Sequence, residues 1–301
     1  MAPRDVVDRV VERLWPGRRA EVEPLPGGIT NANFVVDLGD EKVVVRVPGS
    51  GREALGIDPA GELAASALAA DIGVAPEIVA YDEELGCLVS RFLPARPIPA
   101  AEMGHEPMLG SVIETVRRVH NAGRVDTTFD YFTIIDQYHE RAAARGVDEP
   151  FDFASARAVM RSVAQARPFR PTVLGHNDLL SANFLFDGSV RILDWEYAGM
   201  TDPFFDLANL SANHEFDAGT DKALLGHYFG ASGEGLLATL ALFKLVSELR
   251  EAMWGVVQSA VSDLDMDFVA YAGDHDGRFR ALLEQMDLPD VLALAEQSAR
   301  S

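Results

Sequence analysis

"VLGHNDLLSANFLFDGSVRILDWEYAGMTDP", residues 173–203, sets polar side chains at regular intervals between two apolar runs. His176, Asp178 and Asn183 follow the order H-x-D-x4-N, and a further aspartate ends the second apolar run at Asp194. The "DGS" between the runs predicts a tight turn, so that the runs pair as an antiparallel hairpin. Such pairing brings Asn183 and Asp194 to the same end of the hairpin, near Asp178.

The oxygen atoms that converge at this point suit phosphoryl transfer from a nucleotide. Mg²⁺ prefers oxygen ligands and commonly takes one or two carboxylates beside phosphate oxygens, so Asn183 and Asp194 are candidate metal ligands. Asp178 is then free to orient a hydroxyl nucleophile and accept its proton. Histidine, aspartate and asparagine also recur in loops as turn and cap residues, which is the structural alternative for this motif.

The motif and the segment "EYAGMTDPFFDLANL" that follows it resemble, in order, the catalytic core of the protein-kinase-like small-molecule kinases. That family includes the aminoglycoside phosphotransferases and the choline and ethanolamine kinases. The resemblance implies ATP and Mg²⁺ as cofactors and Asp178 as catalytic base. It also implies metal binding by Asn183 and Asp194, and a structural role for His176, which braces the loop.

The rest of the chain divides by pattern into a β-rich part and a helical part. Residues 4–15 have helical valine spacing, and glycine-punctuated Val- and Phe-rich runs follow before a helix that ends near Gly73. From Pro94 onward we expect helices over 108–121, 134–145, 153–166, 221–229, 234–259 and 277–297. The expected fold class is α+β, a bilobal protein-kinase-like fold. A small antiparallel-sheet lobe with one main helix (1–93) binds nucleotide, and a larger, mostly helical lobe (94–301) carries catalysis and substrate binding.

The stretch "LPGGITNANF" lies where a hairpin that covers the nucleotide is expected. Gly27 and Gly28 could offer backbone N–H groups to phosphates, with Thr30 and Asn31 as side-chain donors. Glycines also serve hairpins for backbone reasons alone. The G-G-x-T-N form is similar to the choline-kinase-like branch of the family.

Two further segments of the first lobe are candidates for nucleotide binding. "KVVVRVPG" places Arg46 where protein kinases carry a phosphate-binding lysine, and Glu62 on the next helix is its expected ion-pair partner. The alternative is a surface arginine and a solvated glutamate. "CLVSRFLP", with Arg91 and Phe92, resembles the inter-lobe strand whose backbone receives adenine, and its apolar residues equally fit a core strand.

Acidic residues after the motif favour a small cationic alcohol as substrate. "DWEYAGMTDPFFDLANLSANHEFD" contains no Lys or Arg, and Glu196 and Glu215 within it are candidate substrate contacts. Residues 244–283 resemble the closing segment of choline and ethanolamine kinases, which implies that Trp254 and Tyr271 help form an aromatic box for an ammonium group. A helical tryptophan is otherwise typical of a core. Glu251 stands where choline kinases commonly carry a second tryptophan, and a carboxylate there suits a primary amine better than a quaternary one.

Composition excludes several other classes of protein. The chain has 301 residues, 48% of them apolar, and its net charge of −21 opposes binding to nucleic acid or to an anionic membrane surface. No signal peptide or apolar run of membrane-spanning length is apparent, so we expect a cytoplasmic protein without membrane insertion. The lone cysteine, Cys87, excludes an internal disulfide and is interpreted as a core residue.

Two alternatives stay open: an aminoglycoside or other antibiotic phosphotransferase, and a catalytically silent nucleotide-binding module.

Overall fold

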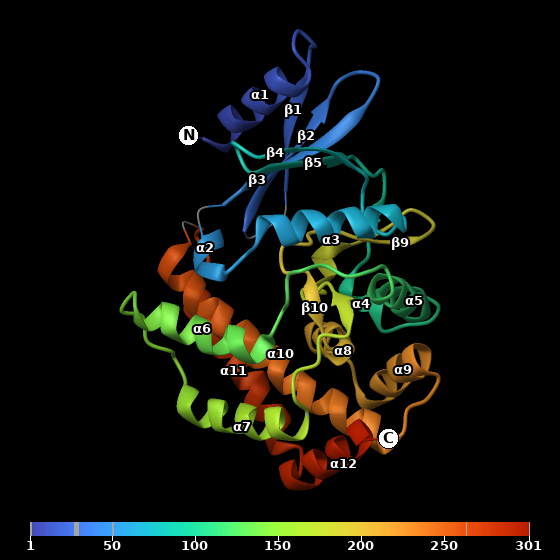
Figure 1. Cartoon of the computed structure of the whole chain (residues 1–301), viewed down its shortest axis with the longest axis vertical. Helices are drawn as coiled ribbons and strands as arrows, with labels where there is room; N and C mark the ends of the chain where they lie inside the picture. Colours follow the sequence, from blue (N-terminus) through green and yellow to red (C-terminus); the bar gives the residue numbers. More distant parts are fainter. Residues whose placement is uncertain (1, 27–29, 50, 263, 301) are drawn as a thin grey trace.

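Five antiparallel strands form the sheet of the amino-terminal part of the chain (Figure 1). Their spatial order is β1-β2-β3-β5-β4, with bounds β1 (Glu21–Leu25), β2 (Asn31–Asp37), β3 (Lys42–Pro48), β4 (Ile78–Asp82) and β5 (Cys87–Arg91). The computed structural model describes all residues except 1, 27–29, 50, 263 and 301. Every second residue of β3 is buried, beginning at Val43, because successive side chains of a strand point to opposite faces.

Helix α1 (Pro3–Leu14) packs on this sheet. Its buried valines, Val6, Val7, Val10 and Val11, recur at helical spacing and join the buried valines of the sheet in one apolar cluster. The helix predicted over residues 4–15 is therefore confirmed, to within one residue at each end.

Helix α3 (Pro59–Asp71) lies between the sheet and the helical part of the molecule (Figure 1). It begins after Asp58, whose side chain caps the first turn, and it ends before Gly73, whose φ of 68° is left-handed. Its buried Ala65 and Ala69 belong to the larger apolar cluster, which they share with the helices of the carboxy-terminal part.

The carboxy-terminal part is built around one long helix, α10 (Glu234–Val261). Every residue from Leu242 to Gln258 is buried, because α6, α8, α11 and α12 pack around this helix. The remaining helices are α2 (Arg52–Leu55), α4 (Ala100–Met103), α5 (Met108–His120), α6 (Tyr131–Ala143), α7 (Phe153–Ala166), α8 (Pro203–Asn213), α9 (Ala218–Phe229), α11 (Phe268–Glu284) and α12 (Leu288–Arg300). Within the described residues no single helix is long and apolar enough to cross a membrane; α9 and α10 pass that test only when joined, and they are bent by 110°.

The prediction of one helix over residues 277–297 is wrong, because two helices, α11 and α12, occupy this region. The chain leaves the helical path after Glu284, and the Asp287 side chain then accepts a hydrogen bond from the backbone N–H of Asp290 at 3.3 Å. Pro289 fits the first turn of α12 but could not lie inside a continuous helix, since it lacks an N–H group.

Short strands carry the opening motif. Strand β7 (Val173–Gly175) pairs with β10 (Gly199–Thr201), while β6 (Arg96–Pro97), β8 (Phe184–Phe186) and β9 (Val190–Ile192) form a second small sheet. Between β7 and β8 lies a single 3₁₀ turn, η1 (Ser181–Asn183). The predicted hairpin is confirmed by the pairing of Phe184 with Ile192, which sets Asn183 and Asp194 beside each other at its end. The α+β fold class, with a small antiparallel sheet followed by a larger helical part, is confirmed as well.

Candidate active site

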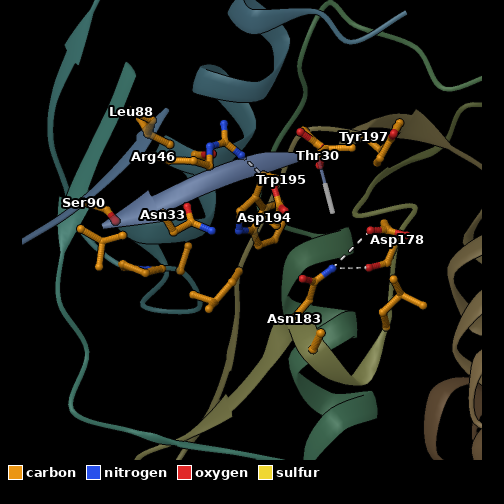
Figure 2. A pocket seen from close by; sticks show the side chains of 18 of the residues that line it. Thr30, Asn33, Arg46, Leu88, Ser90, Asp178, Asn183, Asp194, Trp195 and Tyr197 are labelled. Atoms are coloured by element: carbon orange, nitrogen blue, oxygen red, sulfur yellow. Dashed lines mark hydrogen bonds and ion pairs between the residues drawn. The ribbon is translucent and has the colours of Figure 1, made fainter. Parts of the chain in front are cut away.

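A cavity of about 300 Å³ lies between the five-stranded sheet and the helical part (Figure 2). Asp178, Asn183 and Asp194 all line it, although the η1 turn and the β8–β9 hairpin separate them along the chain. Figure 2 shows Asn183 reaching toward Asp178, and Arg46 reaching from the sheet toward Asp194. The motif residues predicted to converge therefore share one cavity.

The loop that holds Asp178 is anchored by Asp206 of α8. The backbone N–H groups of His176 and Asn177 donate to the two oxygens of this carboxylate, over 2.8 and 2.6 Å. His120 of α5 lies 3.0 Å from the same carboxylate through its Nε2 atom. Asp206 is 1% exposed, so these bonds form in a site without competing solvent, and they fix the start of the loop.

His176 connects the loop to the hairpin. Its Nε2 lies 2.8 Å from the carbonyl oxygen of Leu193, and its Nδ1 lies 3.3 Å from the backbone N–H of Asp178. Burial lowers the pKa of this imidazole, so the ring is neutral, donates through Nε2 and accepts through Nδ1. This geometry suits the bracing role expected of His176, because one ring contacts the residues beside Asp178 and Asp194.

Asp178 itself is held by Asn183. The Asn183 Nδ2 donates to the Asp178 backbone carbonyl at 2.9 Å and to its Oδ2 at 3.3 Å. Burial raises the pKa of the Asp178 carboxyl well above its ordinary value; the Arg250 guanidinium, 3.9 Å away, opposes this rise, and the Glu251 carboxylate adds to it. A carboxylate with a raised pKa is a stronger proton acceptor, as a general base requires.

Two residues of the site have left-handed backbone conformations that residues other than glycine rarely adopt. Asn177 has a φ of 66° and Asp194 a φ of 61°. Hydrogen bonds hold the first of them, because its Nδ2 donates to the carbonyl oxygen of Tyr197 at 2.9 Å. Such strained positions concentrate at functional sites, and here they flank both ends of the motif.

Arg46 forms the predicted ion pair with Glu62, which excludes the alternative of a surface arginine. The Arg46 side chain is 12% exposed, and its Nη1 also lies 2.7 Å from Oδ1 of Asp194. Arg52, which the sequence did not single out, forms a second ion pair with Glu62. This chain of charges connects the sheet and α3 to the end of the hairpin.

Asn31 and Glu196 form hydrogen bonds that the sequence did not reveal. Asn31 is buried, and its Nδ2 donates to Oε2 of Glu196 at 2.7 Å, while Thr30 donates through Oγ1 to Oε1 at 2.5 Å. Thr30 and Glu196 also line the cavity, so the expected contacts of these residues with a phosphate or an acceptor stay predictions. Gly27 and Gly28 lie outside the described residues.

Asn183 and Asp194 fit a magnesium ion that is shared with phosphates. With Nδ2 of Asn183 directed at Asp178, the amide oxygen is the free ligand atom of that side chain. One amide oxygen and one carboxylate suit Mg²⁺, which takes few protein ligands and keeps phosphate and water oxygens. Among the residues that the structure describes, no group of three or more His, Cys, Asp or Glu side chains forms a protein-only metal site.

The opposite wall of the cavity carries the predicted acceptor residues Glu251, Trp254 and Tyr271. The Trp254 and Tyr271 rings lie 5.4 Å apart, and the Tyr271 hydroxyl donates to Oε2 of Glu251 at 3.0 Å. Tyr197 joins this wall, because its hydroxyl accepts the Trp254 Nε1 hydrogen bond at 2.8 Å. Glu215, by contrast, is not among the residues that line the cavity; its side chain is 78% exposed and lies 3.9 Å from Arg278, and its expected contact with an acceptor stays a prediction.

Arg91 and Phe92 line the sheet side of the cavity. The Arg91 guanidinium pairs with Glu41 at 2.5 Å, and the Phe92 backbone N–H donates to the carbonyl oxygen of Lys42 at 3.0 Å. Cys87 of β5 is fully buried, and burial raises the pKa of its thiol to about 11, as suits a core residue.

Comparison with known proteins decides the family. The model of a family described as "Phosphotransferase enzyme family" matches residues 21–243. The chain belongs to this family. The prediction of a phosphotransferase with a protein-kinase-like fold is thereby confirmed.

Relatives of this phosphotransferase include choline and ethanolamine kinases. The crystal structure of a choline/ethanolamine kinase family protein from Mesorhizobium loti superposes on this chain with a TM-score of 0.80. The two sequences are 29% identical, and the match covers 97% of this chain and 99% of that one. Protein LicA of Haemophilus influenzae is 28% identical over 61% of this chain and 56% of its own length. Human ethanolamine kinase 2 is 32% identical over 34% of this chain and 32% of its own length. The phosphotransferase thus matches only about half of LicA and a third of the human enzyme.

Two residues of the candidate site were not predicted from the sequence. Arg250 and Tyr197 both line the cavity. The sequence contains a feature that could have identified Arg250, since this residue lies with Glu248 and Glu251 inside a largely apolar stretch of α10. A helix that is apolar all round is buried, so charged residues within it need partners.

Proposed function

We propose that this phosphotransferase transfers the γ-phosphoryl group of ATP to the hydroxyl of a small cationic amino alcohol, with choline and ethanolamine as the first candidates. The observation that carries the proposal is one cavity that combines Asp178, Asn183 and Asp194 with an aromatic and acidic wall. The names of the Mesorhizobium loti and human relatives support the same substrate class.

Asp178 is proposed to act on the acceptor hydroxyl. Its carboxylate orients the hydroxyl toward the phosphate and accepts the proton as the new O–P bond forms and the bond to the leaving diphosphate breaks. Asn183 keeps the carboxylate in position through its 2.9 and 3.3 Å hydrogen bonds. Placement and charge supply most of the rate in such a reaction, because its transition state is loose.

Asn183 and Asp194 would hold Mg²⁺, which, when bound, neutralises charge on the nucleotide phosphates. Arg46, kept in position by Glu62, is proposed to bind a phosphate through its planar guanidinium. Its ion pair with Asp194 would then be exchanged for contacts with the nucleotide. The sheet wall with Arg91 and Phe92 is proposed to receive the base.

An antibiotic phosphotransferase is the second candidate, because the same three oxygen-bearing residues would serve it. The aromatic wall of Trp254 and Tyr271 favours a compact ammonium group over a large aminoglycoside. A panel of choline, ethanolamine and kanamycin-type acceptors separates the two. Rapid turnover of the aminoglycosides with none of the amino alcohols would refute the proposal.

A catalytically silent binding module is disfavoured by the complete set of Asp178, Asn183 and Asp194. We expect Asp178→Ala and the isosteric Asp178→Asn to lower kcat by about 10²–10⁴-fold, because the proton acceptor is removed. The affinity for Mg·ATP, measured by calorimetric titration, should stay close to that of the wild type. Near-normal kcat in either variant would remove Asp178 from the mechanism, and nucleotide binding by a wild type without product would identify a silent module.

A further inference from the structure

A buried arginine lies under the acceptor wall of the cavity. Arg250 of α10 is 1% exposed, and its guanidinium pairs with the carboxylate of its neighbour Glu251. Its Nη2 also donates to the backbone carbonyl of Asn177 at 3.3 Å. Burial lowers the pKa of this guanidinium, but the Glu251 and Asp178 carboxylates more than offset the effect, so Arg250 is always charged.

The guanidinium lies against two aromatic rings, one of which, Tyr197, belongs to the acceptor wall. Its central carbon lies 4.7 Å from the ring centre of Tyr197 and 5.6 Å from that of Phe129. Both distances are within the range of a cation–π interaction. The protein therefore carries its own cation against Tyr197, the ring that accepts the Trp254 hydrogen bond.

We propose that the Arg250–Glu251 pair determines acceptor specificity, favouring an alcohol with a primary ammonium group over one with a quaternary ammonium group. The inference rests on the proposed function, in which this wall receives the cationic end of the acceptor. It names a class of substrate, of which ethanolamine is the simplest member.

A quaternary ammonium group has no N–H, so it gains affinity from ring faces and from net negative charge. Arg250 weakens both sources, since it covers a face of Tyr197 and neutralises one of the two nearby carboxylates, Asp178 and Glu251. The fixed guanidinium repels any additional positive charge, and a quaternary group has no N–H group with which to offset that repulsion.

A primary ammonium group is compatible with the same wall, because it has three N–H donors. Glu251 receives the Arg250 guanidinium and, at 3.5 Å, the Asn209 amide on Oε1, while among the described residues Oε2 receives only the Tyr271 hydroxyl. Each carboxylate oxygen accepts about two hydrogen bonds, so Oε2 keeps one position for an N–H of the acceptor.

The test compares (kcat/KM) for choline with (kcat/KM) for ethanolamine on one enzyme preparation, so that the fraction of active protein cancels. The variant combines Arg250→Leu with Glu251→Met, because removing both members avoids leaving one buried charge unpaired. We expect the wild-type ratio of choline to ethanolamine to lie below one. In the double variant it should rise by about 2- to 30-fold, which corresponds to one recovered cation–π contact.

A matched control is another buried ion pair of α10, Lys244 with Asp221, at 2.9 Å. Neither residue lines the cavity, so Lys244→Met combined with Asp221→Asn should leave the ratio unchanged. A wild type that prefers choline, a ratio unaltered in the Arg250 and Glu251 variant, or an equal rise in the control would overturn the inference. Absence of turnover with both acceptors would refute the proposed function itself, and the inference with it.

Discussion

Asp206 is the residue whose removal should damage the catalytic loop most. Its carboxylate accepts the backbone N–H groups of His176 and Asn177 over 2.8 and 2.6 Å and pairs with His120 at 3.0 Å. Because the carboxylate is 1% exposed, water cannot replace it without a rearrangement. In Asp206→Ala, two backbone donors beside Asp178 would lose their acceptor.

The expected loss of stability follows from those two bonds. A hydrogen bond to a charged group contributes about 1.5–3 kcal/mol, so Asp206→Ala should lower the free energy of unfolding by about 3–6 kcal/mol. Asp206→Asn keeps one acceptor oxygen and should lose about half as much. The pKa of the Asp206 carboxyl is lowered, since the His120 and backbone hydrogen bonds outweigh the effect of burial. Its contribution is therefore present at neutral pH and is lost as the pH falls through the lowered value.

Urea denaturation followed by circular dichroism measures the loss, and kcat on the same preparations shows whether the loop is displaced. Asp217→Ala is the matched control, because Asp217 caps α9 by accepting the Thr220 N–H at 2.8 Å on an exposed helix end. That change should cost about 1 kcal/mol. A loss in Asp206→Ala no larger than in the control, with kcat retained, would contradict the assignment of Asp206 as the anchor.

Two further predictions concern packing and pH. A Cβ atom on Gly175 would lie 2.3 Å from Cγ2 of buried Thr201. Gly175→Ala should therefore lower the free energy of unfolding by about 1–3 kcal/mol and reduce kcat, and an unchanged midpoint of urea denaturation would contradict this prediction. Burial lowers the pKa of His214 below 6.5, and within the described part of the chain its Nε2 has no hydrogen-bond partner. As the pH falls, His214 therefore binds a proton in the unfolded chain before it does so in the folded protein, and the free energy of unfolding should fall between about pH 7.5 and about pH 5.5. In urea titrations His214→Gln should flatten this pH dependence. A variant with the same pH dependence as the wild type would refute the prediction.

Much of the fold was predictable because its signals are local. The helical valine spacing of residues 4–15 and the "DGS" turn each specify an element over a short stretch, and both elements are present. The break between α11 and α12 was missed because residues 277–297 alternate apolar and polar side chains across it, so only the Asp287 cap and Pro289 mark the end. A helix cap depends on one or two residues, so an apolar pattern averaged over a long window does not reveal it.

The candidate site divides in the same way. Asp178, Asn183 and Asp194 were predictable as neighbours because a hairpin returns the chain to its starting edge. The partners of Glu196 were not, since Thr30 and Asn31 precede it by 166 and 165 positions. The sequence predicted all three as ligand contacts, and only the packed structure shows the hydrogen bonds that join them.

What the sequence by itself determined is the candidate reaction centre: a loop, a turn and a hairpin whose residues lie close in the chain and therefore close in space. What only the tertiary structure decided is the acceptor wall, where Arg250 reaches the backbone of Asn177 across 73 positions and covers Tyr197. The physical reason is that a buried charge must find its partners among the elements packed around it. Those partners depend on how α10 packs against the loop, which no local pattern specifies.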